Sequence, residues 1–343
     1  MDAARPAPRP AVPRERGHLL AGLLWTAPWW LGFLIFLAGP LAVSLYISFC
    51  DYPLLQPPVW VGLENYQRLA HDDVFHKVLV NTLIYAAFAI PLGTVTAVAL
   101  AVLLNRRVRG QALFRACVFV PTIVPLVATG LMWLWMLNPE QGLMNRLLWP
   151  ARQVAAPVGD AIGQVGQALP ESAGPLRDGL ARVQQVSDQF AQGPTWLGAP
   201  GWAMAALVLI SLWGVGSPVV IYLAGLQEIP EELYEAAELD GASGWQRFRF
   251  VTLPGLSPVV LFNVIIAIIG TWQIFALPYV LMNGGPGPER GTYFYTSYLF
   301  DNAFRYLKMG YASAMGWIQL LIILALTALV FWVSRRSVHY RGS

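Results

Sequence analysis

The stretch EELYEAAELDGASGWQRFRFVTLP, residues 231–254, is one compact polar segment in a chain that is otherwise rich in apolar residues. It begins acidic, passes a glycine at Gly241, and ends at Leu253-Pro254 before the next apolar run. At about 3 kcal/mol per charge, burying its charges and that of Glu228 in hydrocarbon would cost on the order of 20 kcal/mol. We therefore expect residues 227–254 to lie outside the hydrocarbon. The charged residues are Glu228, Glu231, Glu232, Glu235, Glu238, Asp240, Arg247 and Arg249.

The same stretch carries signals for two short helices. Pro230 suits a first helical position, and Glu231 follows it in the first turn, where the helix dipole favours an acidic side chain. Gly241 can adopt the left-handed conformation that ends a helix. Ser243 suits the cap of a second short helix that runs to Phe250. We expect an L-shaped helix pair, after which Leu253-Pro254 turns the chain into the next apolar segment.

Composition places the chain among membrane proteins. It has 343 residues, of which 56% are hydrophobic and only 12% are charged, whereas soluble domains carry about 25% charged residues. A bilayer core of about 30 Å needs about 20 helical residues to cross it, and its backbone groups must be satisfied within the helix. We predict an all-α integral membrane protein with six transmembrane helices. The predicted spans are residues 19–49, 78–104, 116–137, 201–226, 255–282 and 309–334.

The arginines predict the orientation. With the first end inside, 13 of the 22 basic residues fall in short inner segments, and the other nine are spread over longer outer loops. This bias follows the positive-inside rule. We therefore expect both termini in the cytoplasm, residues 1–18 as a disordered cytoplasmic tail, and residues 19–343 as the membrane domain. Residues 227–254 are then a cytoplasmic loop, and residues 139–200 are extracytoplasmic. Internal prolines should kink the spans (Pro91, Pro121, Pro125, Pro218 and Pro278).

The sequence lacks the residues that several kinds of function require. The only lysines, Lys77 and Lys308, stand outside any phosphate-binding P-loop, so we expect no ATP hydrolysis by this chain. Cys50 and Cys117 build neither a disulfide framework nor a metal motif. The modest net charge of +3 indicates membrane orientation and not nucleic-acid binding. The central portions of the spans contain no charged residue or histidine, which disfavours a proton-coupled secondary transporter and suits a neutral, hydroxyl-rich solute such as a sugar. A charged solute, which helix termini can bind, stays open.

Polar and aromatic residues deep in the fourth and fifth spans are candidates for contact with the solute. Such residues also serve as contacts between membrane helices, and tryptophan often packs or lies at the membrane interface. Both interpretations stay open at each position. The candidates are Ser211, Trp213, Gly214, Ser217, Asn263, Thr271, Trp272 and Gln273.

The polar stretch resembles the Glu-Ala-Ala loop of bacterial ABC-importer permeases. In that family the pattern is Glu-Ala-Ala, three residues, Gly, nine residues, an aliphatic residue, one residue and Leu-Pro. Here Glu235-Ala236-Ala237, Gly241, Val251 and Leu253-Pro254 match this spacing, with valine in place of the more usual isoleucine. WVGLENYQRL (60–69), GLMNRLL (142–148) and LMNGGPGPERGTYFYTSYLFDNAF (281–304) are similar to the maltose- and glycerol-3-phosphate-type permeases.

The resemblance implies a type I ABC importer permease in a bacterial cytoplasmic (inner) membrane. Such a chain pairs with a second, homologous permease, with an ATPase dimer that binds ATP and Mg, and with an extracytoplasmic solute-binding protein. The solute would be a sugar, with a polyol or glycerol phosphate as the alternative, and a stand-alone channel as the alternative of another class. The loop would be the coupling helix, with Glu235, Ala236, Ala237, Asp240, Gly241, Leu253 and Pro254 at the ATPase contact. Sugar contacts would fall near Gly214, Ser217, Thr271 and Gln273.

The outer loop is longer than this resemblance leads us to expect. Two apolar stripes in it follow the i, i+3/i+4 spacing of amphipathic helices, and Pro170 and Pro175 separate them. We predict a helical hairpin outside the membrane, which either binds the solute-binding protein or braces the permease. The stripes are Val154, Val158, Ile162, Val165 and Leu169, then Leu176, Leu180, Val183, Val186 and Phe190.

Overall fold

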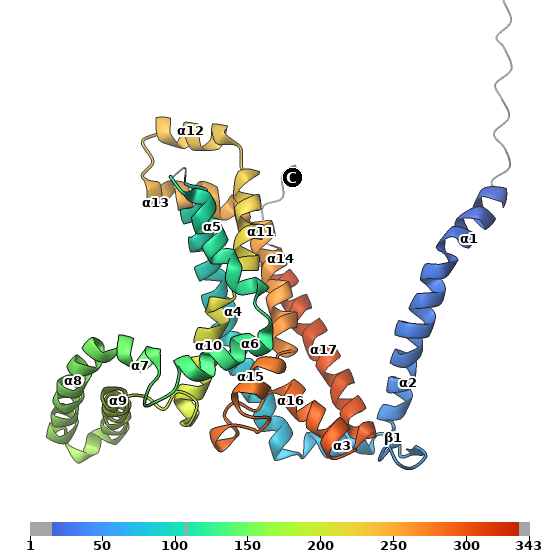
Figure 1. Ribbon diagram of the computed structural model, residues 1–343, viewed down its shortest axis with the longest axis horizontal. Helices are drawn as coiled ribbons and strands as arrows, with labels where there is room; N and C mark the ends of the chain where they lie inside the picture. The colour runs from blue at the N-terminus through green and yellow to red at the C-terminus, as the bar shows by residue number, and fades with distance from the viewer. Residues whose placement is uncertain (1–15, 107–108, 336–343) are drawn as a thin grey trace, which may run out of the picture.

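The computed structural model describes residues 16–106 and 109–335, most of which are helical (Figure 1). The predicted tail falls largely outside this part of the chain, because residues 1–15 are not described. Within the described ranges, four helices are long and apolar enough to cross a membrane, or up to six if each of two bent helix pairs counts as one span. The four are Ala21–Ser48, Asp73–Asn105, Gly244–Trp272 and Met309–Ser334.

The two bent pairs correspond to the third and fourth predicted spans. Gln111–Ile123 (α5, Gln111–Phe119, with η2, Val120–Ile123) meets α6 (Leu126–Met136) at 101°. The break falls before Pro125, which cannot donate a backbone hydrogen bond. Helices α10 (Pro200–Trp213) and α11 (Gly216–Gln227) meet at 47°, just before Pro218. Pro91, by contrast, lies inside the unbroken α4 (Asp73–Asn105).

The first apolar segment stands away from the other helices (Figure 1). It comprises α1 (Arg16–Phe33), η1 (Leu34–Ala38) and α2 (Gly39–Ser48), and it joins the body through strands β1 (Cys50–Asp51) and β2 (Val59–Trp60). Its foot packs on α17 (Met309–Ser334), where Gly310 lies against the backbone of Cys50. Higher up, most of its side chains are exposed, Trp25 by 87%.

The polar stretch forms one end of the molecule, which we call the α12 end, and the opposite end carries α3 (Glu64–Ala70) (Figure 1). Helix α12 (Glu231–Leu239) is followed by α13 (Gly244–Arg247), η4 (Phe248–Thr252) and α14 (Leu253–Trp272). The chain is helical without a break from Gly244 to Trp272. The second predicted helix is therefore the beginning of the next span, and Leu253-Pro254 continues that helix instead of turning the chain.

Two helices of the long loop pack side by side as an antiparallel pair, α8 (Trp149–Ala168) and α9 (Gly174–Gln192). The short α7 (Leu143–Leu147) leads into them, and η3 (Glu171–Ala173) joins them. Trp196 donates its indole N–H to Asn145, and Arg152 donates to the carbonyl oxygen of Ala191, so the base of the pair is closed by side chains.

The end opposite α12 is held by a carboxylate and two phenols. Asp72 caps α4 by accepting from the backbone N–H groups of Val74 and Phe75, and it also accepts from the hydroxyls of Tyr298 and Tyr311. These bonds join the beginning of α4 to α16 (Tyr295–Phe300) and to α17. The remaining elements lie between α14 and α17 in the chain: α15 (Ala276–Leu281), η5 (Pro288–Arg290) and η6 (Asp301–Arg305).

Candidate functional site

The loop that carries the Glu-Ala-Ala pattern is an ordered elbow, which we define as residues 231–252. Gly241 adopts a φ of +74°, the left-handed conformation expected where α12 ends. Ser243 then caps α13, because its hydroxyl accepts from the N–H of Gln246 while the Gln246 side chain accepts from the N–H of Ser243. The turn between the two helices is thus fixed by backbone conformation and by a reciprocal cap.

Two side-chain contacts join the arms of the elbow. Glu238 pairs with Arg247 at 3.0 Å, and the hydroxyls of Tyr234 and Thr252 are 3.0 Å apart. The ion pair is largely exposed and contributes little, within about 1 kcal/mol. The hydroxyl pair is partly buried, because Tyr234 packs on the apolar cluster formed by α4, α11 and α14. The tyrosine is therefore the firmer of the two links.

The elbow is attached to two closely packed helices. A Cβ at Gly225 of α11 would lie 2.8 Å from Val259 of α14, and a Cβ at Gly255 would lie 2.8 Å from Ile229. Only glycine permits this approach without displacement of the neighbouring side chain. Helices α11 and α14 therefore carry the elbow as a closely packed pair.

The outer surface of the elbow is exposed. Glu235, Ala236, Asp240 and Gly241 are exposed, whereas Ala237 is half-buried. Apolar side chains are exposed beside them: Leu239 is 89% exposed and Trp245 is 67% exposed. Leu253 and Pro254 lie at the beginning of α14, beneath this surface. Small residues flanked by carboxylates and exposed apolar groups are typical of a contact with another protein.

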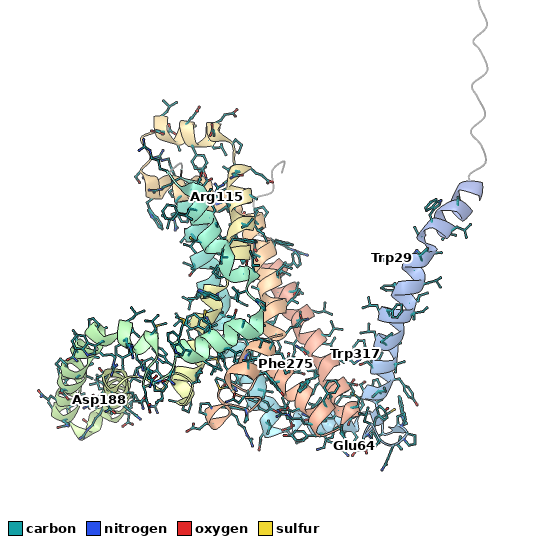
Figure 2. The ribbon with its side chains drawn as sticks, in the orientation of Figure 1. Trp29, Glu64, Arg115, Asp188, Phe275 and Trp317 are labelled. Carbon is teal, nitrogen blue, oxygen red and sulfur yellow. The ribbon has the colours of Figure 1, made fainter. Side chains whose placement is uncertain are left out.

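A cavity of about 760 Å³ lies between the helices that lead away from the elbow. All of the candidate solute contacts except Trp272 line it: Ser211, Trp213, Gly214, Ser217, Asn263, Thr271 and Gln273. Phe275, which also lines it, lies in the middle of the body, well away from Asp188 in the α8–α9 pair (Figure 2). The fourth and fifth predicted spans thus bring their polar groups to one place.

Trp272 lies elsewhere. Its side chain is almost fully buried, 1% exposed, against Tyr295 and the α17 residues Ala314 and Met315. Its backbone oxygen accepts from Thr296 and from Gln319. Successive side chains on a helix differ in direction by about 100°. Trp272 therefore points away from the cavity, although its neighbours Thr271 and Gln273 line it.

Further cavity residues were not among the candidates that the sequence suggested. Tyr85 and Thr94 of α4 line the cavity together with Thr122 of η2 and Tyr222 of α11. Tyr85 lies beside Ser211, and Tyr222 lies beside Thr94, so each of these phenols has an aliphatic hydroxyl next to it. The signal was available as polar residues within the second, third and fourth apolar segments, where each was open to interpretation as a contact between helices.

The cavity wall can accept hydrogen bonds without carrying charge. Thr271 and Ser211 donate their hydroxyl protons to backbone oxygens of their own helices, at 2.9 Å to Ala267 and 2.6 Å to Val208, which leaves lone pairs on the hydroxyl oxygens as acceptors. None of the described lining residues is Asp, Glu, Lys, Arg or His. Such a wall can bind a neutral polar solute through hydroxyl, amide and aromatic groups, and it offers no charged group for proton transfer.

Residues 89–339 match the family described as "Binding-protein-dependent transport system inner membrane component". The chain belongs to this family. It is therefore the membrane permease component of an ABC importer, and ATP is hydrolysed by a separate subunit of such systems. This match confirms the resemblance that the Glu-Ala-Ala pattern indicated, and it favours an importer permease over a stand-alone channel or a secondary transporter.

Relatives share nearly the whole chain. The probable ABC transporter permease protein YesP of Bacillus subtilis (strain 168) is 34% identical over 325 residues, which is 94% of this chain and 93% of that protein. The lactose transport system permease protein LacF of Rhizobium radiobacter is 30% identical over 309 residues, 86% of this chain and 91% of that protein. A bacterial alginate ABC transporter, solved with a pentasaccharide-bound periplasmic protein, shares the fold with a TM-score of 0.70 and 20% identity, over 94% of this chain and 96% of that one.

Proposed function

We propose that this chain moves a neutral sugar across the membrane as one half of a paired pore. The observation that carries the proposal is the uncharged cavity, which is built partly from α11 and α14, the same helices that hold the elbow. Sugar hydroxyls would donate to Ser211, Ser217 and Thr271, and the ring faces of Trp213 and Phe275 would cover the apolar faces of the sugar. The printed name of the lactose permease relative supports a saccharide as the solute.

The elbow is the contact with the ATPase in this proposal. Its exposed surface would enter a groove of an ATPase subunit, with Glu235, Ala236, Ala237, Asp240 and Gly241 at the contact and Leu253 and Pro254 behind them. Because α11 and α14 pack closely from the elbow toward the cavity, a shift of the elbow would move the cavity wall with it. ATP and Mg would be bound by the ATPase dimer and not by this chain.

The proposed topology counts each bent pair as one span, which gives six spans and a type I importer fold over residues 19–343. In Figure 1, α1 begins and α17 ends on the side of the molecule where α12 lies. The excess of basic residues in the segments on this side supports a cytoplasmic location for it. Residues 227–254 would then be cytoplasmic and residues 139–200 extracytoplasmic, with both termini in the cytoplasm.

A second permease would complete the pore. The first apolar segment stands apart from the other helices, with Trp25 and Phe36 among its exposed side chains, and so leaves a lateral apolar surface. We infer that a homologous permease occupies the space beside it and supplies the rest of the solute path. An extracytoplasmic binding protein, as the family description implies, would deliver the sugar.

Uptake by the complete transporter tests this function. Membranes that contain this chain, the second permease, the ATPase and the binding protein should accumulate a labelled neutral saccharide when ATP is supplied. An unlabelled neutral sugar should compete, and glycerol phosphate should not. Uptake of the phosphate ester alone would contradict the neutral-sugar assignment, and conductance by the purified single chain without ATP would support a channel instead.

A further inference from the structure

The contact between α8 and α9 of the hairpin is made mostly by small and polar residues. Gly159, Gly163 and Gly166 of α8 face α9, where a Cβ on Gly159 would meet Asp188 and Ser187, one on Gly163 would meet Gln184, and one on Gly166 would meet Leu180. Ser187 also donates its hydroxyl proton to the backbone oxygen of Ala155. Helices that must hide apolar side chains usually place them between one another, whereas this pair uses mostly small and polar residues there, with Leu180 beside them.

Most of the apolar side chains are consequently left outside the contact between the two helices. Six of them, three on each helix, are 48% to 61% exposed. They are Val154, Val158 and Val165 on α8, and Leu176, Val183 and Val186 on α9.

Helix geometry places both sets on one face of the hairpin. On a helix with about 100° per residue, the exposed apolar residues of α8 lie about 90° around the helix from the residues that touch α9. Those of α9 lie about 90° around that helix from the residues that touch α8, and the direction of rotation is the same when each helix is viewed from its N-terminus. Because the two helices are antiparallel and face each other, the two sets then point to the same side of the hairpin. Together they form one broad surface, which we call the apolar face of the hairpin.

The opposite side of the hairpin is polar. The same geometry puts glutamines and charged residues there, at Asp160, Gln164, Gln167, Arg177 and Gln185. No charged residue falls within the apolar face itself. The hairpin is therefore amphipathic across its two broad sides, like a helix that lies at a membrane surface.

Its position suits a membrane surface. Figure 1 views α9 almost along its axis while α4, α14 and α17 are seen from the side, so the hairpin runs across the direction of the spans. It lies toward the α3 end of the molecule, beside the beginning of α10. Phe190, which lies at the edge of the apolar face, stacks on Trp202 of α10 at 6.0 Å, and this contact makes the face continuous with a membrane-crossing helix.

We propose that the apolar face of the α8–α9 hairpin lies on the lipid bilayer, so that the insertion is an interfacial anchor beside the pore. Its helices of 20 and 19 residues would each lie along the surface for about 30 Å at 1.5 Å per residue. The proposal depends on the membrane location that the family establishes, and not on the identity of the solute.

The composition of the apolar face favours lipid over the binding protein. Protein interfaces are enriched in aromatic residues and arginine and carry about one hydrogen bond per 100–200 Å². The exposed part of this face consists of valine and leucine, and its aromatic residue, Phe190, already stacks on Trp202. Aliphatic side chains without hydrogen-bonding groups match acyl chains and offer little to a specific protein partner.

Spin labels on the two sides of the hairpin test the proposal in the complete transporter, reconstituted into phospholipid nanodiscs. Cys117→Ala removes the exposed cysteine, and Cys50 is fully buried. Single cysteines then replace Val158 or Val183 on the apolar face, and Gln164 or Gln185 on the polar side as matched controls. For each spin label, the collision rate with oxygen, which concentrates in lipid, is compared with the collision rate with a water-soluble nickel complex.

We expect the ratio of the oxygen collision rate to the nickel collision rate to be several-fold higher at positions 158 and 183 than at positions 164 and 185. This difference should be present with or without the binding protein. Equal nickel accessibility on both sides would overturn the proposal. Labels at 158 and 183 that become shielded from both reagents only when the binding protein is added would overturn it in favour of a docking surface. All four sites are exposed, so monodisperse elution of each variant establishes that the labels report on a folded chain.

Discussion

The hydroxyl of Tyr234 lies 3.0 Å from the hydroxyl oxygen of Thr252, and this contact joins α12 to the turn that precedes α14. Thr252 is buried and also donates toward the backbone oxygen of Arg247 at 3.4 Å. Without this link, α12 would be attached to α14 through the turn at Gly241, one exposed ion pair and the apolar packing of the Tyr234 ring. The hydroxyl contact therefore adds a direct polar link through which a force on α12 would reach α14.

Tyr234→Phe should weaken this link without unfolding the chain, because a net hydrogen bond contributes about 1 kcal/mol. We expect the ATPase to remain bound, while stimulation of ATP hydrolysis by the loaded binding protein falls. The measurement is ATPase activity in nanodiscs with and without the binding protein. Tyr46→Phe on α2, an exposed tyrosine far from the elbow, is the control. Unchanged stimulation in Tyr234→Phe would show that the hydroxyl contact does not transmit motion.

Glu235→Lys should reduce co-purification of the ATPase, because it reverses a charge on the exposed surface of α12. Gly241→Asp should act in the same direction, since the φ of +74° there costs a non-glycine residue about 1 kcal/mol and displaces the end of the helix. Both variants should still insert into the membrane. Gln185→Lys on the hairpin is the matched charge control, and ATPase recovery at its level in both elbow variants would count against the contact.

Thr271→Val keeps the shape of the side chain and removes a hydrogen-bond acceptor from the cavity. Loss of one such bond, about 1 kcal/mol, should raise the KM for sugar uptake by about fivefold with little change in maximal rate. Thr296→Val is the control, because Thr296 donates to the backbone oxygen of Trp272 outside the cavity lining. A KM that shifts equally in both variants would mean that the loss is structural and not due to solute contact.

Asp72→Asn tests the carboxylate at the opposite end. Burial acts to raise the pKa of Asp72, but hydrogen bonds from Tyr298, Tyr311 and two backbone N–H groups outweigh it and hold the pKa below its ordinary value of 3.8. The stability contributed by the ionised carboxylate is therefore full above about pH 3.8 and is lost as the pH falls through the lowered pKa. At pH 7 the variant should be less stable by about 2 kcal/mol, the order expected for hydrogen bonds to a charged group.

Thermal unfolding in detergent between pH 7 and pH 3 measures this effect. The gap between wild type and Asp72→Asn should narrow as the pH approaches 3, because the wild-type carboxylate becomes protonated. Asp73→Asn, the exposed neighbour in the first turn of α4, should remain within about 0.5 kcal/mol of wild type, as is usual at the surface. A gap that is constant with pH would show that ionisation of Asp72 is not what stabilises this end.

The elbow could be predicted from the sequence almost residue by residue, because its signals are local. A left-handed Gly241, a capping Ser243 and an acidic first turn are features of backbone conformation and neighbouring side chains. What the sequence did not indicate is that the helix runs on through Leu253-Pro254. Pro254 lies in the first turn of α14, where proline is tolerated, and the π-helical turn before it keeps the chain helical.

The cavity was predictable only in part. Polar residues near the elbow stood out against apolar surroundings, but which side of a helix each one faces depends on packing between distant segments. Trp272 faces away for this reason, and Tyr85 and Thr94 were not selected because α4 lies far from the elbow in sequence. Likewise, Pro125 marked a weak point in the third span, but a proline does not by itself predict a bend of 101°.

The absence of charged groups from the described cavity wall has an electrical consequence. Moving one elementary charge through a membrane potential of 100 mV involves about 2.3 kcal/mol. A neutral sugar that passes an uncharged wall carries no current, so the voltage across the bacterial membrane neither assists nor opposes its passage. A cell that uses this transporter could then concentrate its nutrient to the same extent whether its membrane is energised or collapsed, so long as nucleotide is supplied.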